Sequence, residues 1–256
     1  ALTKAIFWIK ESVMKKGLTE LQAVKRIDTN RSKNKHFHSL SFPTIAGSGP
    51  NGAIIHYRAN NNSNRKINKK DIFLCDSGGQ YKYGTTDVTR TICFSKQKNS
   101  IKNIFTKVLK GHISMATTNL KKFNTGKKVD SRARQFLKKD GLDYAHGTGH
   151  GVGFFSNVHE GPQSITKINN VKLEEGMIVS NEPGYYKEGH YDVALKHFQA
   201  ASAVDSALAE VHYNEAIALD KLGQHGEATT HFKIAQENAN GNKAILESKI
   251  LLSHVQ

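Results

Sequence analysis

The segment DSGGQYKYGTTDVTRT, residues 76–91, places two aspartates on either side of a predicted turn. Asp76 follows the apolar run IFLC, Asp87 lies in the alternating run TTDVTRTICF, and GGQYKYG between them is typical of a turn, so the segment predicts a β-hairpin. Such a hairpin can point both carboxylates into one cavity, where they could bind two divalent metal ions, and paired ions usually serve hydrolysis. Acids that flank a turn are also common without any site, so the pair alone leaves both interpretations open.

The hairpin also bears on the two cysteines, Cys75 and Cys93. If Asp76 and Asp87 lie directly opposite each other, each cysteine faces a residue other than the second cysteine, so the thiols should not meet. No run reaches the roughly 18 apolar residues of a membrane span. The N-terminal segment is amphipathic without a cleavage signal, and it starts inside a helical pattern, which suggests a trimmed start. These features predict a reduced, soluble, cytoplasmic protein with no membrane partner.

Helical periodicity lies on both sides of a strand-rich region. The predicted helices span residues 1–16, 19–33, 101–120 and 129–139. The predicted strands span residues 41–49, 53–59, 71–78, 85–94 and 176–186, with an Asn-rich surface loop at 59–67 and a Gly/His-rich stretch at 146–161. This order predicts an α+β domain.

The charge and composition of the chain change near Gly189. Residues 1–189 hold 32 Lys and Arg against 14 Asp and Glu, a net charge of +18, whereas residues 190–256 hold 5 against 8, a net charge of −3. Pro, Arg and Cys are absent after Gly189, and Ala-rich helical patterns take over. The change predicts two domains, residues 1–188 and 189–256.

The overall net charge of +15 raises the question of nucleic-acid binding. The lysines, however, are scattered among asparagines, without interleaved aromatic residues or a recognition-helix pattern. A solvated surface explains this pattern better than a nucleic-acid site. We therefore expect no specific nucleic-acid partner.

The second predicted domain contains an internal repeat with a period of 34 residues, which is the period of the tetratricopeptide repeat. Residues 209–242 resemble one full unit of two helices, residues 190–202 supply only a second helix, and residues 243–255 predict a final helix. The matching pairs are Gly189 and Gly223, Ala194 and Ala228, His197 and His231, Phe198 and Phe232, and Ala201 and Ala235. An all-α module of this kind predicts a possible protein partner.

Three further motifs accompany the hairpin: SFPTIAGSGPNGAIIHYRA before it, and HGTGHGVGFFSNVHEGP and LEEGMIVSNEPGYY after it. In this order and at this spacing, the four motifs resemble the catalytic domain of aminopeptidase P (Xaa-Pro aminopeptidase), of the pita-bread metallopeptidase superfamily. The resemblance covers residues 1–188. It implies a pita-bread fold, a curved antiparallel sheet with flanking helices, followed by the tetratricopeptide-like helical hairpin module.

The resemblance implies a dinuclear metal site and hydrolysis of the N-terminal peptide bond before proline, so that the partners are peptides with proline at the second position. Asp76 and Asp87, with Asp87 bridging, resemble metal ligands, as do His150 of HGTGH and Glu182 of NEPGYY. Carboxylate-rich sites suit hard ions such as Mn²⁺, and the single imidazole would also admit Co²⁺ or Zn²⁺. Two divalent ions, most simply manganese, are therefore the expected cofactors.

Three other histidines match positions that bind substrate carbonyls and move protons in the resembling family. They are His56 in AIIHYRA, His146 in HGTGH and His159 in NVHEGP. A near-neutral pKa suits histidine for that task. We expect these three to be the catalytic residues.

One element of the family pattern has no counterpart. The fifth metal ligand is a second bridging Glu in a segment resembling G-I-R-I-E shortly after the EPG motif, and here Glu188 and Gly189 lead directly into the helical repeat. The other acids of the second domain lie on predicted amphipathic helices, where a solvated surface is expected: Glu210, Glu215, Glu227, Glu237 and Glu247. The alternative function is therefore a catalytically inactive fusion or remnant that binds proteins through its tetratricopeptide helices.

Overall fold

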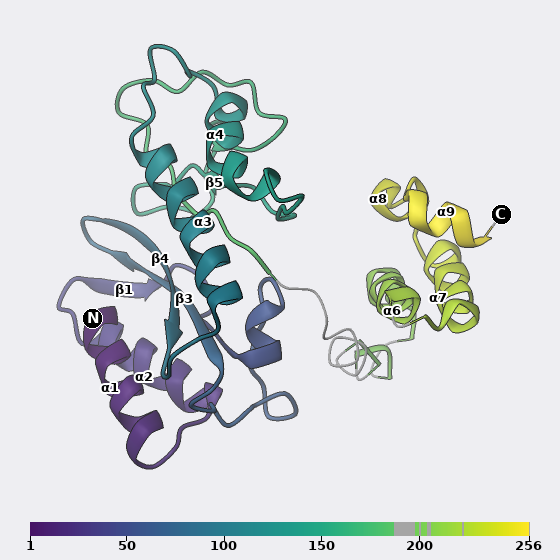
Figure 1. Cartoon of the computed structure of the whole chain (residues 1–256), viewed down its shortest axis with the longest axis horizontal. Helices are drawn as coiled ribbons and strands as arrows, with labels where there is room; N and C mark the ends of the chain where they lie inside the picture. Colours follow the sequence, from purple (N-terminus) through teal and green to yellow (C-terminus); the bar gives the residue numbers. More distant parts are fainter. Residues whose placement is uncertain (187–197, 200, 204–205, 222, 256) are drawn as a thin grey trace. The chain divides into compact units, whose positions relative to one another are not determined.

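The computed structural model describes residues 1–186, 198–199, 201–203, 206–221 and 223–255. The chain divides into two compact units, Ala1–Tyr186 and Lys187–Gln256, which are described separately below (Figure 1). No helix among the described residues is long and apolar enough to cross a membrane.

The first unit begins with two helices, α1 (Leu2–Lys15) and α2 (Glu20–Ser32), which lie where the periodicity predicts them. Between them Gly17 has a positive φ of 81°, a conformation that glycine adopts easily. Thr19 then begins α2 with a capping box, in which its hydroxyl and the side chain of Gln22 each accept the other residue's backbone N–H. The Gly and Thr therefore end one helix and start the next.

The central antiparallel sheet is built around one long strand, β3 (Ile72–Tyr81). The strand β4 (Gly84–Cys93) pairs with it along its whole length. The other edge of β3 is shared by two short strands, β1 (Phe37–Leu40) and β2 (Ile45–Ser48), which are also antiparallel to it. The predicted hairpin is thus the core of the sheet.

The hairpin register differs from the one assumed from sequence. Asp76 lies opposite Thr89, and Asp87 lies opposite Gly78, so the two acids are diagonal neighbours rather than direct partners. The tight turn between Tyr81 and Gly84 fixes this register. Because residues two apart on a strand share a face, both carboxylates still lie on the same side of the sheet.

The cysteines stay apart in this register. Cys75 lies opposite Arg90, and Cys93 lies opposite Ile72. Both thiols are free in the described structure.

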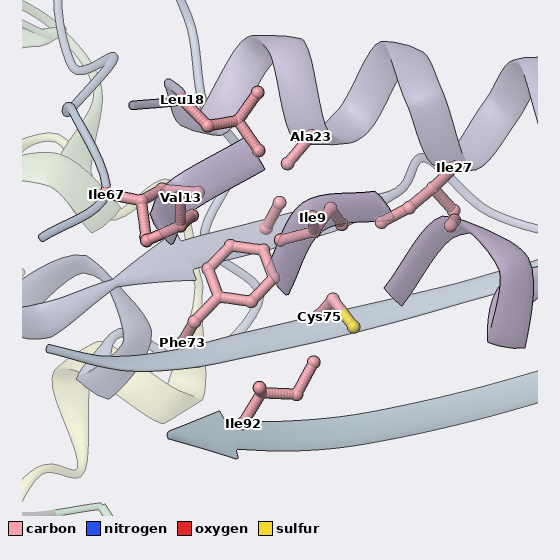
Figure 2. Packing of buried hydrophobic residues seen from close by; sticks show 11 residues of the cluster. Ile9, Val13, Leu18, Ala23, Ile27, Ile67, Phe73, Cys75 and Ile92 are labelled. Carbon is pink, nitrogen blue, oxygen red and sulfur yellow. The ribbon is translucent and has the colours of Figure 1, made fainter. Parts of the chain in front are cut away.

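The two N-terminal helices cover one face of the sheet and form the main hydrophobic core with it (Figure 2). Ile9 of α1 and Ile27 of α2 are fully buried, and they meet Phe73 and Cys75 of β3. Asp76 alternates with these two buried residues along β3 and therefore faces away from this core. The strand thus uses one face for packing and leaves the other for polar groups.

Two predicted strands do not form. Residues 53–59 were expected to be a strand, but a 3-10 helix, η1 (Gly49–Ala53), and a turn occupy this region, because Gly49, Pro50 and Gly52 favour turns. Residues 176–186 were expected to be a closing strand, but they are irregular except for an isolated bridge between Gly151 and Val179. Pro183 has no N–H to give to a ladder, which limits regular pairing there.

The rest of the first unit contains two further helices, α3 (Asn99–Ala116) and α4 (Gly126–Lys138), close to their predicted positions. A two-stranded antiparallel sheet of β5 (Gly149–His150) and β6 (Ser164–Ile165) follows. A small second core joins Val129 of α4 to Ile165 of β6. This packing positions the Gly/His-rich stretch.

The second unit is helical in its described residues. Its helices are α6 (Ala209–Lys221), α7 (His225–Glu237), α8 (Lys243–Leu246) and α9 (Lys249–Val255). The predicted helix 190–202 lies mostly outside the described residues, although 198–199, 201 and 202 are helical. The single predicted helix 243–255 is instead two helices, because Ser248 interrupts it: its hydroxyl accepts the N–H of Leu251, as an N-cap does.

Candidate metal centre

Four side chains that the sequence pattern assigns as metal ligands meet on the polar side of the sheet. Nε2 of His150, on β5, lies 3.1 Å from Oδ2 of Asp87 on β4 and 3.0 Å from Oε1 of Glu182. The carboxyl groups of Asp76 and Asp87 are close enough to share a hydrogen bond. The structure therefore brings residues from three separate motifs to one place.

The orientation of His150 leaves one ring nitrogen for this centre. Its Nδ1 lies 2.8 Å from the carbonyl oxygen of Gly151, which can only accept a hydrogen bond, so Nδ1 carries a proton. In the neutral ring Nε2 is then the atom with a free lone pair, and it faces the carboxylates. A backbone carbonyl that fixes the ring in this way is a common partner of metal-binding histidines.

In the absence of a metal, the two carboxylates attract a proton to His150. Burial alone would lower the pKa of this imidazole, but hydrogen bonds to Asp87 and Glu182 outweigh it and raise the pKa from 6.5 to about 10. The same position that holds a proton can hold a metal ion instead, because both are attracted by the negative charge.

The surroundings of Asp76 disfavour its charged form. Burial and the nearby charge of Asp87 raise its pKa from 3.8 to about 7, against the opposing effect of a hydrogen bond from Thr89. Its Oδ1 is buried and has no hydrogen-bond partner among the described residues. A buried carboxylate oxygen without a partner is costly unless a cation satisfies it.

Glu182 is held in place by Ser180. The hydroxyl of Ser180 donates a short hydrogen bond to Oε1 of Glu182 and accepts one from the backbone N–H of His150 at 2.9 Å. Burial would raise the pKa of Glu182, but the hydrogen bonds from His150 and Ser180 lower it overall. Glu182 is therefore ionised at neutral pH.

Two of the predicted catalytic histidines lie beside this centre. The ring of His159 stacks on that of His150, with centroids 3.7 Å apart, and Asp87, His150 and His159 offer ligand atoms within 4.8 Å of one another. Burial and the charge of His150 lower the pKa of His159. His159 is thus a neutral base close to the carboxylates, and it is also a candidate ligand.

His146 is oriented by its own loop. Its Nδ1 lies 2.7 Å from the carbonyl oxygen of Gly147, while its Nε2 is buried and has no partner in the described part of the chain. Burial lowers the pKa of His146, so the ring is neutral. With Nδ1 donating to Gly147, Nε2 is left free to accept a proton or a hydrogen bond from a substrate.

His56 lies in the turn that replaces the predicted strand. It is exposed, has a positive φ of 59°, and is near enough for its charge to lower the pKa of both His146 and His159. The turn is anchored by Glu20, a fully buried acid of α2 that accepts hydrogen bonds from Asn51 and Tyr57. The structure thus brings all three predicted histidines to the same side of the sheet.

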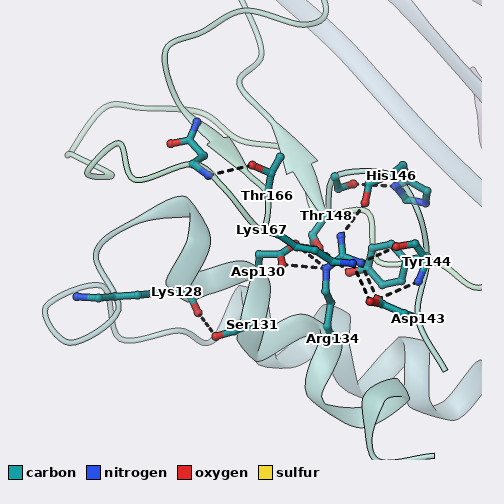
Figure 3. A network of polar contacts seen from close by, with 12 residues as sticks. Lys128, Asp130, Ser131, Arg134, Asp143, Tyr144, His146, Thr148, Thr166 and Lys167 are labelled. Atoms are coloured by element: carbon teal, nitrogen blue, oxygen red, sulfur yellow. Dashed lines mark hydrogen bonds and ion pairs between the residues drawn. The ribbon is translucent and has the colours of Figure 1, made fainter. Parts of the chain in front are cut away.

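An arginine that the sequence analysis did not single out positions the HGTGH loop (Figure 3). Arg134 is 1% exposed and pairs with Asp130, which is one helical turn earlier on α4, at 2.8 Å. Its other nitrogens donate to the carbonyl oxygens of Tyr144 and His146, both at 2.7 Å. The only sequence signal was an acid and an arginine four residues apart on the apolar side of a helix.

The solvent exposure of the acidic side chains in the second unit agrees only in part with the prediction. Glu210, Glu227, Glu237 and Glu247 are exposed, in agreement with the prediction. Glu215 is 1% exposed, which corrects the expectation of a solvated surface for this residue. It points into the interface of α6 and α7, next to two histidines. Glu188 lies outside the described residues.

The residues present fit divalent metal ions. The orphaned Oδ1 of Asp76 and the free lone pair of His150 face a group of carboxylates, which is the donor set of hard and borderline ions. The described residues supply four predicted ligands here, with His159 as a further nitrogen donor.

Comparison with known proteins agrees with this chemistry. Residues 1–219 match the metallopeptidase family M24, past the predicted domain boundary at residue 188. The "Probable Xaa-Pro aminopeptidase P" of Laccaria bicolor is 46% identical over 200 residues, which cover 77% of this chain and 31% of that protein. The protein of the same name from Paracoccidioides lutzii is 44% identical over 209 residues, 80% of this chain and 34% of the relative.

Solved structures show the same likeness in three dimensions. An X-prolyl aminopeptidase from Caenorhabditis elegans, a cytosolic enzyme with a di-nuclear active site, aligns with a TM-score of 0.69 at 27% identity, covering 91% of this chain and 45% of that one. Prolidase from Pyrococcus furiosus aligns with a TM-score of 0.61 at 27% identity, covering 73% and 53%. These matches support the pita-bread fold, and the tetratricopeptide-like module stays a prediction.

The chain spans about a third of the length of the curated relatives it matches.

Proposed function

Because the chain belongs to metallopeptidase family M24, we propose that it hydrolyses the N-terminal peptide bond before proline, as the names of its relatives indicate for them. The observation that supports this most is the meeting of His150 with Asp87 and Glu182 at 3.1 and 3.0 Å. These residues come from three separate motifs of the sequence. Their convergence favours a site over three unrelated polar residues.

Asp76, Asp87, His150 and Glu182 would hold two divalent ions, with Asp87 as a proposed ligand of both. Manganese is the proposed metal because carboxylates dominate the donor set. Bound ions would lower the pKa of a water molecule and stabilise charge on the scissile carbonyl.

The histidines of the chain would handle protons and orient the substrate. Nε2 of His146 is buried, neutral and free to bind a polar group of the peptide. His159, whose pKa is also lowered, can accept a proton near the carboxylates and return it to the leaving amine. His56, on its anchored turn, would bind the peptide at the edge of the site. Peptides with proline at the second position are the proposed substrates.

Metal content and hydrolysis of an Xaa-Pro peptide, measured on one purified sample, test this function. We expect Mn²⁺-dependent cleavage, a loss of more than about 100-fold for Asp87→Asn, since even residues that only support metal ligands cost 10- to 100-fold, and no change for the exposed control Glu174→Gln. An Xaa-Ala peptide is the substrate control. Absence of Mn²⁺ binding and of turnover in the wild type would refute the proposal.

The alternative from the sequence, an inactive remnant that binds proteins through its helices, gains no support from the comparisons. The helix pair α6 and α7 does pack through small buried residues, Ala216 and Ala228, as a tetratricopeptide hairpin would. No described feature identifies what such a surface would bind. The peptidase is therefore the proposed function, and the protein partner and the cytoplasmic location stay predictions.

A further inference from the structure

The second unit contains a cluster of two imidazoles and one carboxylate that has no part in the proposed peptidase. His212 and Glu215 lie on α6, and His231 lies on α7. Oε2 of Glu215 is 3.0 Å from Nδ1 of His212 and 2.9 Å from Nδ1 of His231. The two Nδ1 atoms are 3.0 Å apart. The three atoms form a nearly equilateral triangle.

The helix positions bring these side chains together. His212 and Glu215 are three residues apart and so share one face of α6, toward α7. Ala216 and Ala228 are fully buried beside them, and their small size lets the two helices approach closely. The cluster is therefore part of the helix interface.

The carboxylate at the centre of the cluster is buried but incompletely satisfied. The side chains of Glu215 and His212 are 1% and 7% exposed, and that of His231 is 27% exposed. Oε2 of Glu215 accepts no hydrogen bond from any residue that the structure describes, although two ring nitrogens lie within 3.0 Å. A buried carboxylate oxygen in this state is stabilised by a cation, either a protonated imidazole or a metal ion.

Two of the three side chains are oriented by hydrogen bonds to residues outside the cluster. Nε2 of His212 lies 3.0 Å from the carbonyl oxygen of Ser206, so Nε2 carries the proton and the lone pair of the neutral ring is on Nδ1. The hydroxyl of Ser202 donates to Oε1 of Glu215 at 2.9 Å, which leaves Oε2 for the cluster. Carbonyl and hydroxyl partners of this kind accompany metal ligands in proteins.

We propose that Nδ1 of His212, Oε2 of Glu215 and Nδ1 of His231 bind one divalent transition-metal ion of the zinc class. A tetrahedral zinc with bonds of about 2.0–2.2 Å separates its ligands by about 3.4 Å, so the observed triangle needs to open by only a few tenths of an ångström. Two nitrogens and one oxygen favour Zn²⁺, Co²⁺ or Ni²⁺ over Mn²⁺. The half-buried edge at His231 leaves the fourth position to water.

A second cluster in the same unit, with Asp220 on α6, His225 on α7 and His254 on α9, provides a comparison. Oδ1 of Asp220 lies 2.9 Å from Nδ1 of His225 and 3.0 Å from Nε2 of His254. Here the carboxylate oxygen is hydrogen-bonded to both rings, and the side chain of His225 is 68% exposed. This carboxylate oxygen already has two ring partners and requires no metal.

Zinc binding to the full chain and to three variants tests the proposal. Equilibrium dialysis against buffered Zn²⁺ should show one fewer ion per chain, or at least about 10-fold weaker binding, for Glu215→Gln and for His231→Gln. The matched control His225→Gln should bind as the wild type does. Circular dichroism checks that every variant keeps its helices. Of the two cluster variants, His231→Gln changes the more exposed side chain and is the less able to unfold the unit.

X-ray absorption at the zinc edge gives a second readout. The wild type should show imidazole ligands, and His231→Gln should lower their number. Equal zinc binding in all four proteins would overturn the proposal and leave a cluster held by protons only. Loss of zinc in His225→Gln alone would also overturn it and assign the ion to the Asp220 cluster. Every variant keeps the first unit unchanged, so the outcome does not depend on peptidase activity.

Discussion

His150 and Asp87 lie 63 residues apart in sequence, yet Nε2 of the histidine is 3.1 Å from Oδ2 of the aspartate. The contact joins the small sheet of β5 and β6 to the hairpin of β3 and β4. In the absence of metal this contact holds a proton, since the carboxylates around His150 raise its pKa to about 10. A metal ion bound at Nε2 would therefore compete with this proton for the same lone pair.

Binding of Mn²⁺ should therefore release protons. At pH 7.5 the metal-free His150, with a pKa of about 10, is protonated. Asp76, with a pKa of about 7, is partly protonated at this pH. We expect about one proton or slightly more to leave per chain as the site fills. Calorimetry in buffers of different ionisation enthalpy measures this number. Asp87→Asn, which removes an acceptor of His150, should release fewer, and an equal release would contradict the assignment.

Arg134→Met should destabilise the first unit by about 3–5 kcal/mol, because it leaves the carboxylate of Asp130 buried without its partner. The substitution also frees the carbonyl oxygens that orient the HGTGH loop. Chemical denaturation gives the free energy of unfolding. The exposed Lys128→Met on the same helix is the control and should change it by less than about 0.5 kcal/mol. Similar losses in both variants would show that the network contributes little.

The stability contributed by Asp143 should depend on pH. Partial burial would raise its pKa, but hydrogen bonds from Lys167 and Arg134 hold it well below the ordinary 3.8. The folded pKa is depressed, so the stabilisation is present above about pH 4 and is lost as the pH falls toward the folded pKa. The wild type should be more stable than Asp143→Asn at pH 6, and this advantage should shrink below about pH 4. A constant difference across this range would contradict the pairing.

Gly151→Ala should reduce peptidase activity strongly. A Cβ at this position would collide with the carbonyl oxygen of Glu160, so the backbone beside His150 would have to move. A shift of about 1 Å in a catalytic group can cost about 100-fold in rate. The control is Gly226→Ala in α7, where no described atom lies within 4 Å of the added carbon. Wild-type kinetics in Gly151→Ala would show that the loop tolerates the shift.

Much of the first unit could be predicted because local patterns decide it. The alternation around Asp76 and Asp87 and the helical periodicity before and after them specify elements that the structure contains. The register of the hairpin could not be predicted, because it depends on a turn whose length the sequence GGQYKYG leaves open. The segment at residues 176–186 has the strand pattern, and Ser180 and Glu182 donate their N–H groups to the carbonyl oxygens of His150 and Thr148, but this pairing yields only one bridge and no regular strand.

The candidate site residues that lie inside sequence motifs could be predicted, whereas the residues that position them could not. Asp76, His150 and Glu182 stand in short motifs of recognisable composition. Arg134 and Ser180 act through contacts with distant backbone groups, which no local pattern reveals. Glu215 was misjudged because an amphipathic pattern does not state which face meets another helix.

The hydroxyl of Ser180 makes two hydrogen bonds at once: it accepts one from the backbone N–H of His150 and donates one to the carboxylate of Glu182. A displacement of this one side chain would move a proposed nitrogen ligand and a proposed oxygen ligand together. Variation at position 180 would thus alter both in a correlated way, whereas variation at either proposed ligand alone would leave the other where it is. The spacing between these two donors would then depend on a residue that is not itself a proposed ligand.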